Sequence, residues 1–252
     1  AGIGGDFYRG VEVAGELLAI RGRVIPSTLN NVTLVGSTVS GETLIGETRV
    51  GNSSDRLRSL ALIPANPAAH PEAVRAIEDA DLIVIGPGSL FTSIVPNLLI
   101  SDISAALASS PAFKIYVCNV AEEPAQTEGY SVLDHSKVVQ HYGGKGAIDA
   151  VLANNNLPQR PTPAGLGFIR ANKPWSDDVL LVEADVIDET DDNSTARHDS
   201  IKLSNAIAEA YRKYRGSRRR LPRVRLNLDR NLPSNGDNVI AFATLDQSAV
   251  RI

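Results

Sequence analysis

Residues 83–93, IVIGPGSLFTS, join a short run of apolar β-branched residues to a turn bracketed by glycines and then to a hydroxyl-rich segment. That order predicts a buried strand, a tight turn and the start of a helix. In an open parallel sheet, turns of this kind lie at the carboxyl edge, where ligands bind. Gly86 and Gly88 allow a ligand to approach the backbone closely, and the free N–H groups at a helix start favour an anion. The stretch therefore predicts a site for a phosphate or diphosphate.

The glycine pattern of this turn is weak evidence by itself. Gly-x-Gly-x-x-Phe lacks the third glycine of the dinucleotide-binding fingerprint, and a tight turn with hydroxyls capping the next helix explains the same residues. Under the ligand-binding interpretation, the turn and the first helical residues contact the anion. The candidate ligand-binding residues are Gly86, Pro87, Gly88, Ser89, Leu90, Thr92 and Ser93.

Apolar runs alternate with helical patterns along most of the chain after residue 60. This alternation predicts an α/β fold: a three-layer, Rossmann-like, mostly parallel sheet. Before it, residues 31–50 alternate apolar and polar side chains about Ser40-Gly41, which predicts an inserted β-hairpin, and residues 6–20 predict an amphipathic helix. The predicted strands are 60–63, 82–85, 114–120, 148–152, 179–182 and 239–245, and the predicted helices are 71–80, 93–108, 131–142 and 199–214.

The composition limits the partners. A chain of 252 residues with 43% hydrophobic residues can bury a sizeable core, and its net charge of −4 argues against bulk attraction to nucleic acid or to an anionic membrane. No apolar run approaches the ~18 residues that span a bilayer, and no signal peptide is visible, so we expect a cytoplasmic location. The single cysteine, Cys118, lies in an apolar strand pattern and is expected to be a buried thiol rather than a catalytic one.

The two ends of the chain differ from its middle. Residues 1–214 are predicted to form one α/β ligand-binding domain, and residues 215–252 an arginine-rich C-terminal tail of unknown role. A solvated tail or an interface arm is favoured over nucleic-acid contact, because no aromatic residues are interleaved with the arginines. The chain contains no methionine, so we expect it to begin inside a longer gene product.

Six blocks of sequence, in order, resemble a single family. The run GPGSLFTSIVPNLL is similar to the 2-phospho-L-lactate transferase-like (CofD-like) family, and it fits best the bacterial gluconeogenesis-factor branch. The resemblance implies a UDP-sugar-binding regulator of cell shape and carbon metabolism. Members of the family begin with a Gly-rich strand-turn-helix that carries part of the nucleotide site, and it is missing from this chain. The matching blocks are 18–34, 41–48, 76–90, 114–120, 128–135 and 196–207.

The resemblance also points to residues outside the turn. Asn119 ends the strand KIYVCN, so its amide is expected at the same carboxyl edge, where it suits a sugar hydroxyl, a pyrimidine edge or the capping of a turn. Arg197, in an RHD-like segment before a helix, is implied to contact the nucleotide. Phe168 is the nearest candidate for an aromatic that helps hold it. The family's QPGET-like segment is EPAQT here, and its Gln126 cannot act as a carboxylate base.

Three functions fit these observations. The first is a regulatory protein that binds a UDP-sugar or another nucleotide without turnover, for which no cofactor is certain. The second is a transferase that moves a phospholactyl group onto a deazaflavin, with a magnesium ion neutralising the diphosphate. The third is a dinucleotide-binding oxidoreductase, which needs an acidic ribose partner about 20 residues after the glycines, where residues 109–111 are Ser-Ser-Pro.

The turn favours the first function. The transferases typically carry GPSNP followed by SI, whereas this chain has GPGSLFTS. No Ser-His-Asp or zinc-ligand spacing appears, and His135 and His141, six residues apart on one predicted helix, point in different directions. We therefore expect no metal site and identify no catalytic residue. A homo-oligomer is compatible with the sequence.

Overall fold

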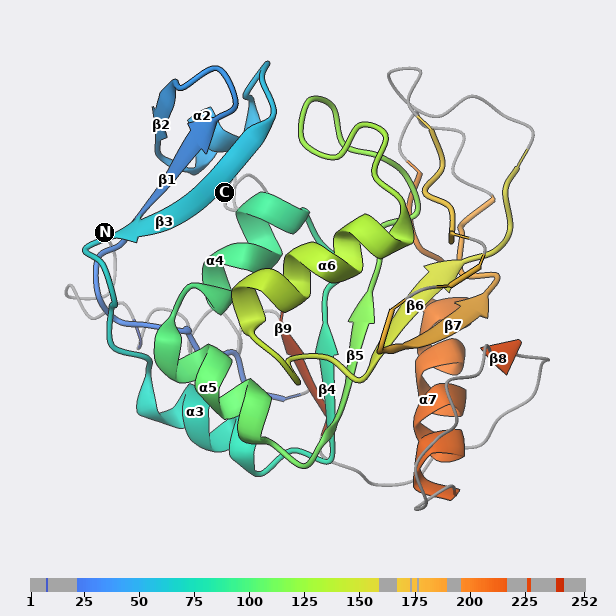
Figure 1. Cartoon of the computed structure of the whole chain (residues 1–252). Helices are drawn as coiled ribbons and strands as arrows, with labels where there is room; N and C mark the ends of the chain where they lie inside the picture. The colour runs from blue at the N-terminus through green and yellow to red at the C-terminus, as the bar shows by residue number, and fades with distance from the viewer. Residues whose placement is uncertain are drawn as a thin grey trace, which may run out of the picture.

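The computed structural model describes Tyr8 and residues 22–158, 167–172, 174–175, 177–189, 196–216, 226–227 and 239–242. Within these residues a six-stranded sheet lies between two layers of helices, and a small three-stranded sheet lies beside one layer (Figure 1). The predicted fold, a three-layer α/β structure with a β-hairpin, is confirmed. The helix predicted over residues 6–20 falls, apart from Tyr8, outside the described residues.

The large sheet is parallel throughout the part of the chain that the structure describes. Its strand order is β8-β7-β6-β5-β4-β9, so consecutive strands from β4 to β8 lie side by side. Two short strands from the segment beyond residue 216 form its edges, beside β7 and β4. The turn after β4 and the end of β5 therefore share one edge. The strands are β4 (Leu82–Ile85), β5 (Phe113–Val117), β6 (Ala150–Asn154), β7 (Leu180–Ala184), β8 (Leu226–Asn227) and β9 (Val239–Phe242).

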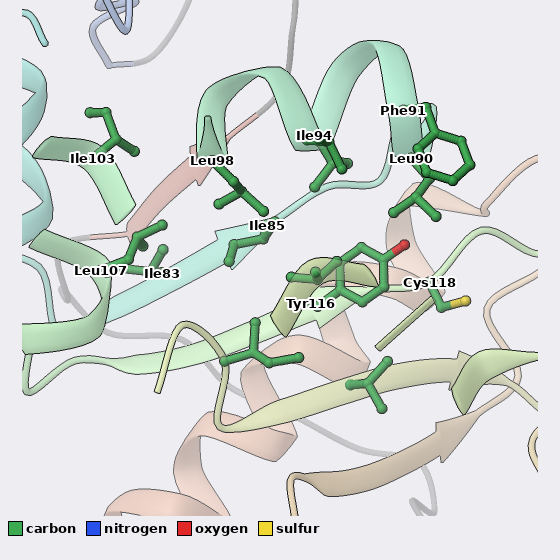
Figure 2. Packing of buried hydrophobic residues seen from close by; sticks show 14 of the residues in the cluster. Ile83, Ile85, Leu90, Phe91, Ile94, Leu98, Ile103, Leu107, Tyr116 and Cys118 are labelled. Atoms are coloured by element: carbon green, nitrogen blue, oxygen red, sulfur yellow. The ribbon is translucent and has the colours of Figure 1, made fainter. Parts of the chain in front are cut away.

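The central strands supply two apolar cores, one on each face of the sheet. Every residue of β4, β5 and β6 is buried, as expected for parallel strands covered on both sides. Ile83, Ile85 and Tyr116 belong to the core on one face (Figure 2), whereas Val84 and Ile115 pack with α7 on the other face. Each fully buried aliphatic side chain contributes about 1.5–3 kcal/mol. The helices are α3 (Pro71–Glu78), α4 (Val95–Leu98), α5 (Ser101–Ser109), α6 (Val132–Gly143) and α7 (Ser200–Gly216).

The small sheet has the order β2-β1-β3 and is antiparallel. The predicted hairpin is present as β1 (Thr33–Thr38) and β2 (Thr43–Ile45), but its last residues form the short helix α2 (Glu47–Gly51). The prediction that residues 60–63 open the parallel series is wrong, because β3 (Leu57–Ile63) pairs with β1. Only alternate residues in the second half of β3 are buried, whereas the central strands of the large sheet are buried on both faces.

The helix predicted over residues 93–108 is also wrong, because the chain bends there. The segments Leu90–Leu98 and Ser101–Ser109 meet at 79°. Ile100 adopts an extended conformation between them, and its N–H group donates to the carbonyl of Asn97. The bend lets Leu98, Ile100 and Ile103, only 0–3% exposed, all reach one core. Packing has overridden a continuous helical pattern here.

The predicted helix starts are confirmed at three places. Ser131 and Asp134 form a reciprocal capping box at α6. Asp199 caps α7, its Oδ1 accepting the backbone N–H groups of Ile201 and Lys202 at 2.8 and 2.9 Å. Pro71 stands in the first turn of α3. Each cap stabilises its helix by about 1 kcal/mol.

No single helix among the described residues has both the length and the apolar character needed to cross a membrane; one bent pair, Leu90–Leu98 with Ser101–Ser109, has them jointly.

Candidate functional site

The turn after β4 depends on its glycines for close packing. Gly86 has φ +86°, and a Cβ atom there would lie 3.1 Å from the carbonyl oxygen of Val117 on β5. A Cβ atom on Gly88 would lie 3.2 Å from the Cβ of Ser93. Only glycine fits the first position without strain. The turn therefore lies directly against the end of β5, which brings the polar residues of the two strand ends together.

The helix that follows presents backbone donors at this edge. It opens with the single π-turn η1 (Leu90–Ile94) and continues into α4, and its first intrahelical donors, Ser93 and Ile94, both bond the carbonyl of Ser89 at 3.0 Å. The N–H groups before them have no helical acceptor. The side chains of Leu90 and Phe91 are buried in the core (Figure 2). Of the two, only Leu90 was a predicted ligand contact, and burial restricts that contact to its backbone.

A carboxylate lies between the two strand ends. The hydroxyl of Ser89 donates to Oε2 of Glu123 at 2.8 Å, and Nδ2 of Asn119 donates to Oε1 of the same side chain at 2.7 Å. The backbone N–H of Glu123 donates to Oγ1 of Thr127 at 2.8 Å. Gln126 stands beside them, with its Oε1 3.4 Å from the Ser89 hydroxyl. The side chains of Ser89, Asn119 and Thr127 thus all contact Glu123. Ser89 and Asn119 were predicted ligand contacts.

Gln126 ties this cluster to the small sheet. Its Nε2 donates to the carbonyl of Gly51 at the end of α2, at 3.1 Å. Gly51 in turn faces the side chain of Thr92, since a Cβ atom on that glycine would lie 3.6 Å from the Thr92 Cγ2. The small sheet and α2 therefore lie beside the carboxyl edge of the large sheet, close to the turn.

Burial shifts the pKa of three groups at this edge, Glu123, Cys118 and His198, toward the neutral form. Burial raises the pKa of the Glu123 carboxyl above its usual range, although the hydrogen bonds from Ser89 and Asn119 lower it in part. Burial also raises the pKa of the Cys118 thiol and lowers the pKa of His198. The prediction that Cys118 is buried is confirmed.

Tyr116 lies below the turn, with its hydroxyl directed toward the start of the helix that carries Leu90 and Phe91 (Figure 2). This hydroxyl is fully buried and has no hydrogen-bond partner within the described part of the chain. Burial, together with the neighbouring Cys118 and Glu123, raises the pKa of Tyr116 well above its usual range. The phenol is therefore neutral, and it adds an unpartnered polar atom beneath the polar cluster.

The RHD-like segment returns to the same edge. Nε2 of His198 lies 3.2 Å from the carbonyl of Cys118, the residue before Asn119. Arg197 is exposed, and its backbone carbonyl accepts from Asp188 at 2.9 Å. The His198 contact thus places the segment beside the end of β5, and the sequence did not reveal this contact.

Phe168, the aromatic candidate, lies beside the segment that follows β5. Phe168 forms an antiparallel bridge with Ala121 and is partly buried against the core beneath α7. The structure therefore brings the turn, Asn119, Phe168 and Arg197 to one region. Their contact with a ligand remains a prediction.

Glu123 was missed by the sequence reasoning, which looked for an acid at the position of Gln126. In the structure, the carboxylate of Glu123 and the amide of Gln126 both lie at the Ser89 hydroxyl. The acid and the amide of QPGET are therefore both present here, with their positions in the sequence exchanged. The signal was present in the sequence, because EPAQT carries a glutamate where QPGET has its glutamine.

Ala125, inside this segment, adopts φ +58°. This left-handed conformation costs an alanine roughly 1–2 kcal/mol relative to glycine, and part of that is offset by the greater freedom of glycine in the unfolded chain. We expect Ala125→Gly to raise the free energy of unfolding by about 0.5–1 kcal/mol, or about 1–4 °C in Tm, measured by denaturant and thermal unfolding.

The matched control is Ala108→Gly, in the exposed part of helix α5. It should have the opposite sign, a loss of about 1 kcal/mol. Destabilisation by both variants would contradict the left-handed conformation at Ala125.

Metal ligands do not gather at this edge. Within the ranges that the structure describes, no group of three or more His, Cys, Asp or Glu side chains could hold a metal ion. His135 is buried and His141 is exposed.

The parallel sheet, its two helical layers and the glycine turn at its carboxyl edge define an α/β protein of the Rossmann-like class. The chain belongs to the 2-phospho-L-lactate transferase CofD family, whose model matches residues 1–188.

The relatives include gluconeogenesis factors. The chain is 32% identical over 221 residues to the gluconeogenesis factor of Bacillus subtilis, covering 82% of this chain and 67% of that protein. It is 38% identical over 222 residues to a relative from Nostoc, covering 83% of this chain and 47% of the relative. The chain thus spans about half to two thirds of the length of these relatives.

Solved structures share the fold. The crystal structure of a protein from Bacillus halodurans matches with a TM-score of 0.75 at 30% identity, covering 81% of this chain and 67% of that one. A second crystal structure from the same organism, of a member of the UPF0052 family, matches with a TM-score of 0.72 at 29% identity, with the same coverage.

Proposed function

We propose that the protein binds a UDP-sugar as a regulatory protein of the gluconeogenesis-factor type, in the cytoplasm, and contributes to the control of cell shape and carbon metabolism. One observation carries the proposal: backbone donors of the turn and the polar side chains of two strand ends meet at the carboxyl edge. Backbone N–H groups suit a diphosphate, and amide and hydroxyl groups suit sugar or uracil edges. The names of the relatives support the regulatory branch.

The alternative is phospholactyl transfer to a deazaflavin. Glu123 favours it, because a general base needs a carboxyl at the ligand edge, and Glu123 lies there at the Ser89 hydroxyl with its pKa raised by burial. Magnesium, which the transferase would use, needs several oxygen ligands. The described residues do not supply that set, so we derive no step through a metal. An oxidoreductase is disfavoured by the family match.

The proposal predicts that UDP-N-acetylglucosamine stabilises the full-length protein. A ligand that binds only the folded state adds about 2.7 kcal/mol at a hundredfold excess over its Kd, or about 5–10 °C in Tm for a domain of this size. The measurement is a thermal-shift titration with UDP-N-acetylglucosamine, UDP-glucose and NAD, beside an assay of deazaflavin phospholactyl transfer with magnesium.

The two arms separate the candidates. Turnover of the phospholactyl donor without a shift by either UDP-sugar would establish the transferase and refute the regulatory proposal. A shift by NAD alone would refute both.

A further inference from the structure

The side-chain donors at the carboxyl edge are already engaged by a carboxylate. Ser89 and Asn119 both donate to Glu123, at 2.8 and 2.7 Å, one to each oxygen. A serine hydroxyl carries a single proton, so Ser89 cannot donate to a ligand while it donates to Glu123. An ionised Glu123 would also repel a phosphate placed at the same hydroxyl. The carboxylate and an anionic ligand therefore compete for the same donors.

We infer that Glu123 makes binding at the proposed nucleotide site proton-linked: a phosphate gains the Ser89 hydroxyl only when the Glu123 carboxyl takes up a proton. The inference rests on the proposed function. In the ligand-bound form the new O–H of Glu123 donates to Oγ of Ser89. The serine proton then turns to the phosphate, while Asn119 keeps its bond to the other carboxyl oxygen. One proton enters the site for each anion bound.

The surroundings of Glu123 permit this uptake. In the part of the chain that the structure describes, Glu123 has no ion pair. From β5 it faces Tyr116, and Cys118 lies one residue from the Asn119 contact; both groups are neutral because burial raises the pKa of each. His198, from the segment before α7, contacts the Cys118 carbonyl and has its pKa lowered.

The other charged groups of the loop are turned to different partners. Glu122 accepts from the backbone of Gly167, and Glu128 accepts from the backbone of Ala125. Arg56, the residue before β3, donates to the carbonyl of Glu128 at 2.9 Å. α2 contributes the carbonyl of Gly51, which accepts from Gln126, and the turn contributes the hydroxyl of Ser89. Neither group is charged. Burial without a paired cation accounts for the raised pKa of Glu123.

The test is isothermal titration of the full-length protein with UDP-N-acetylglucosamine between pH 5.5 and 8.5, in buffers of different ionisation enthalpy. This ligand is chosen because its phosphates are diesters, whereas a terminal phosphate titrates near pH 6 and would add its own proton. The affinity should rise as the pH falls, by up to tenfold per pH unit, with proton uptake on binding. Glu123→Gln should flatten this profile and bind at least fivefold more tightly than the wild type at pH 8.

Glu128→Gln is the matched control, because this exposed carboxylate on the same loop accepts only a backbone N–H group among the described residues. It should keep the wild-type profile. Binding without proton uptake, or an unchanged profile in Glu123→Gln, would overturn the role of Glu123 and leave the proposed function standing. No binding at any pH would overturn the proposed function, and the inference with it.

Discussion

Replacing Gly86 with alanine is expected to destabilise the fold by about 1–3 kcal/mol and to abolish nucleotide binding. A left-handed residue with a side chain costs roughly 1–2 kcal/mol, and φ at this position is +86°. The new Cβ would also lie 3.1 Å from the Val117 carbonyl oxygen, which belongs to the backbone and cannot rotate away. Relief requires the turn to move away from β5, and that movement separates the donors of the turn from Asn119, which follows β5, so the two parts of the proposed site no longer face one ligand.

Two measurements check this prediction: denaturant unfolding, and titration with UDP-N-acetylglucosamine at a temperature where the variant is folded. Gly51→Ala is the control, because a Cβ there would meet only the Thr92 Cγ2 at 3.6 Å, an ordinary contact. This control should change stability little. A Gly86→Ala protein with wild-type stability and affinity would show that the turn does not need its left-handed conformation.

The centre of the fold could be predicted from local patterns. The strand 82–85 was predicted with its observed bounds, because a β-branched run ends at a glycine turn that no helix tolerates. The start of α6 was predicted at residue 131, where Ser131 and Asp134 form a capping box that depends only on residues three apart. Such features are encoded within one or two turns of chain, and local reasoning suffices for them.

The misses arise where distant packing decides. Residues 93–108 have a helical pattern, yet the chain bends by 79° so that Ile100 and its neighbours fill one core. Leu60 and Leu62 are a short apolar pattern compatible with either sheet, and only the pairing of β3 with β1 selects the antiparallel one. Neither outcome follows from propensity. The competing local structures differ in free energy by less than the burial of apolar side chains contributes, and this burial decides between them.

The candidate site shows the same division. The turn and Asn119 were predicted because a parallel sheet brings strand ends to one edge. Glu123 was not predicted, since its partner Ser89 is 34 residues away in sequence. The loop that carries Glu123 also has no hydrophobic periodicity from which its structure could be predicted. His198 was likewise missed as the residue that places its segment, because its contact with the Cys118 carbonyl spans 80 residues.

Replacing Arg197 with alanine is expected to weaken binding of UDP-N-acetylglucosamine at least tenfold. The residue is exposed, and its neighbour His198 fixes the segment beside the end of β5, within the region that holds Asn119. A guanidinium offers a planar pair of donors to phosphate oxygens, and a charge-assisted bond of this kind contributes about 1.5–3 kcal/mol. Because the side chain is exposed, the free energy of unfolding should change by less than about 0.5 kcal/mol.

The control for this variant is Arg75→Ala, an equally exposed arginine near the end of α3, the helix that leads into the amino end of β4. It removes the same charge from a position outside the carboxyl edge, so it changes the net charge as Arg197→Ala does without removing a group from the proposed site. Calorimetric titration at two salt concentrations separates the effects, since screening weakens long-range attraction more than a direct contact. Equal losses of affinity in both variants would place Arg197 outside the ligand contacts and leave the backbone of the turn as the anion site.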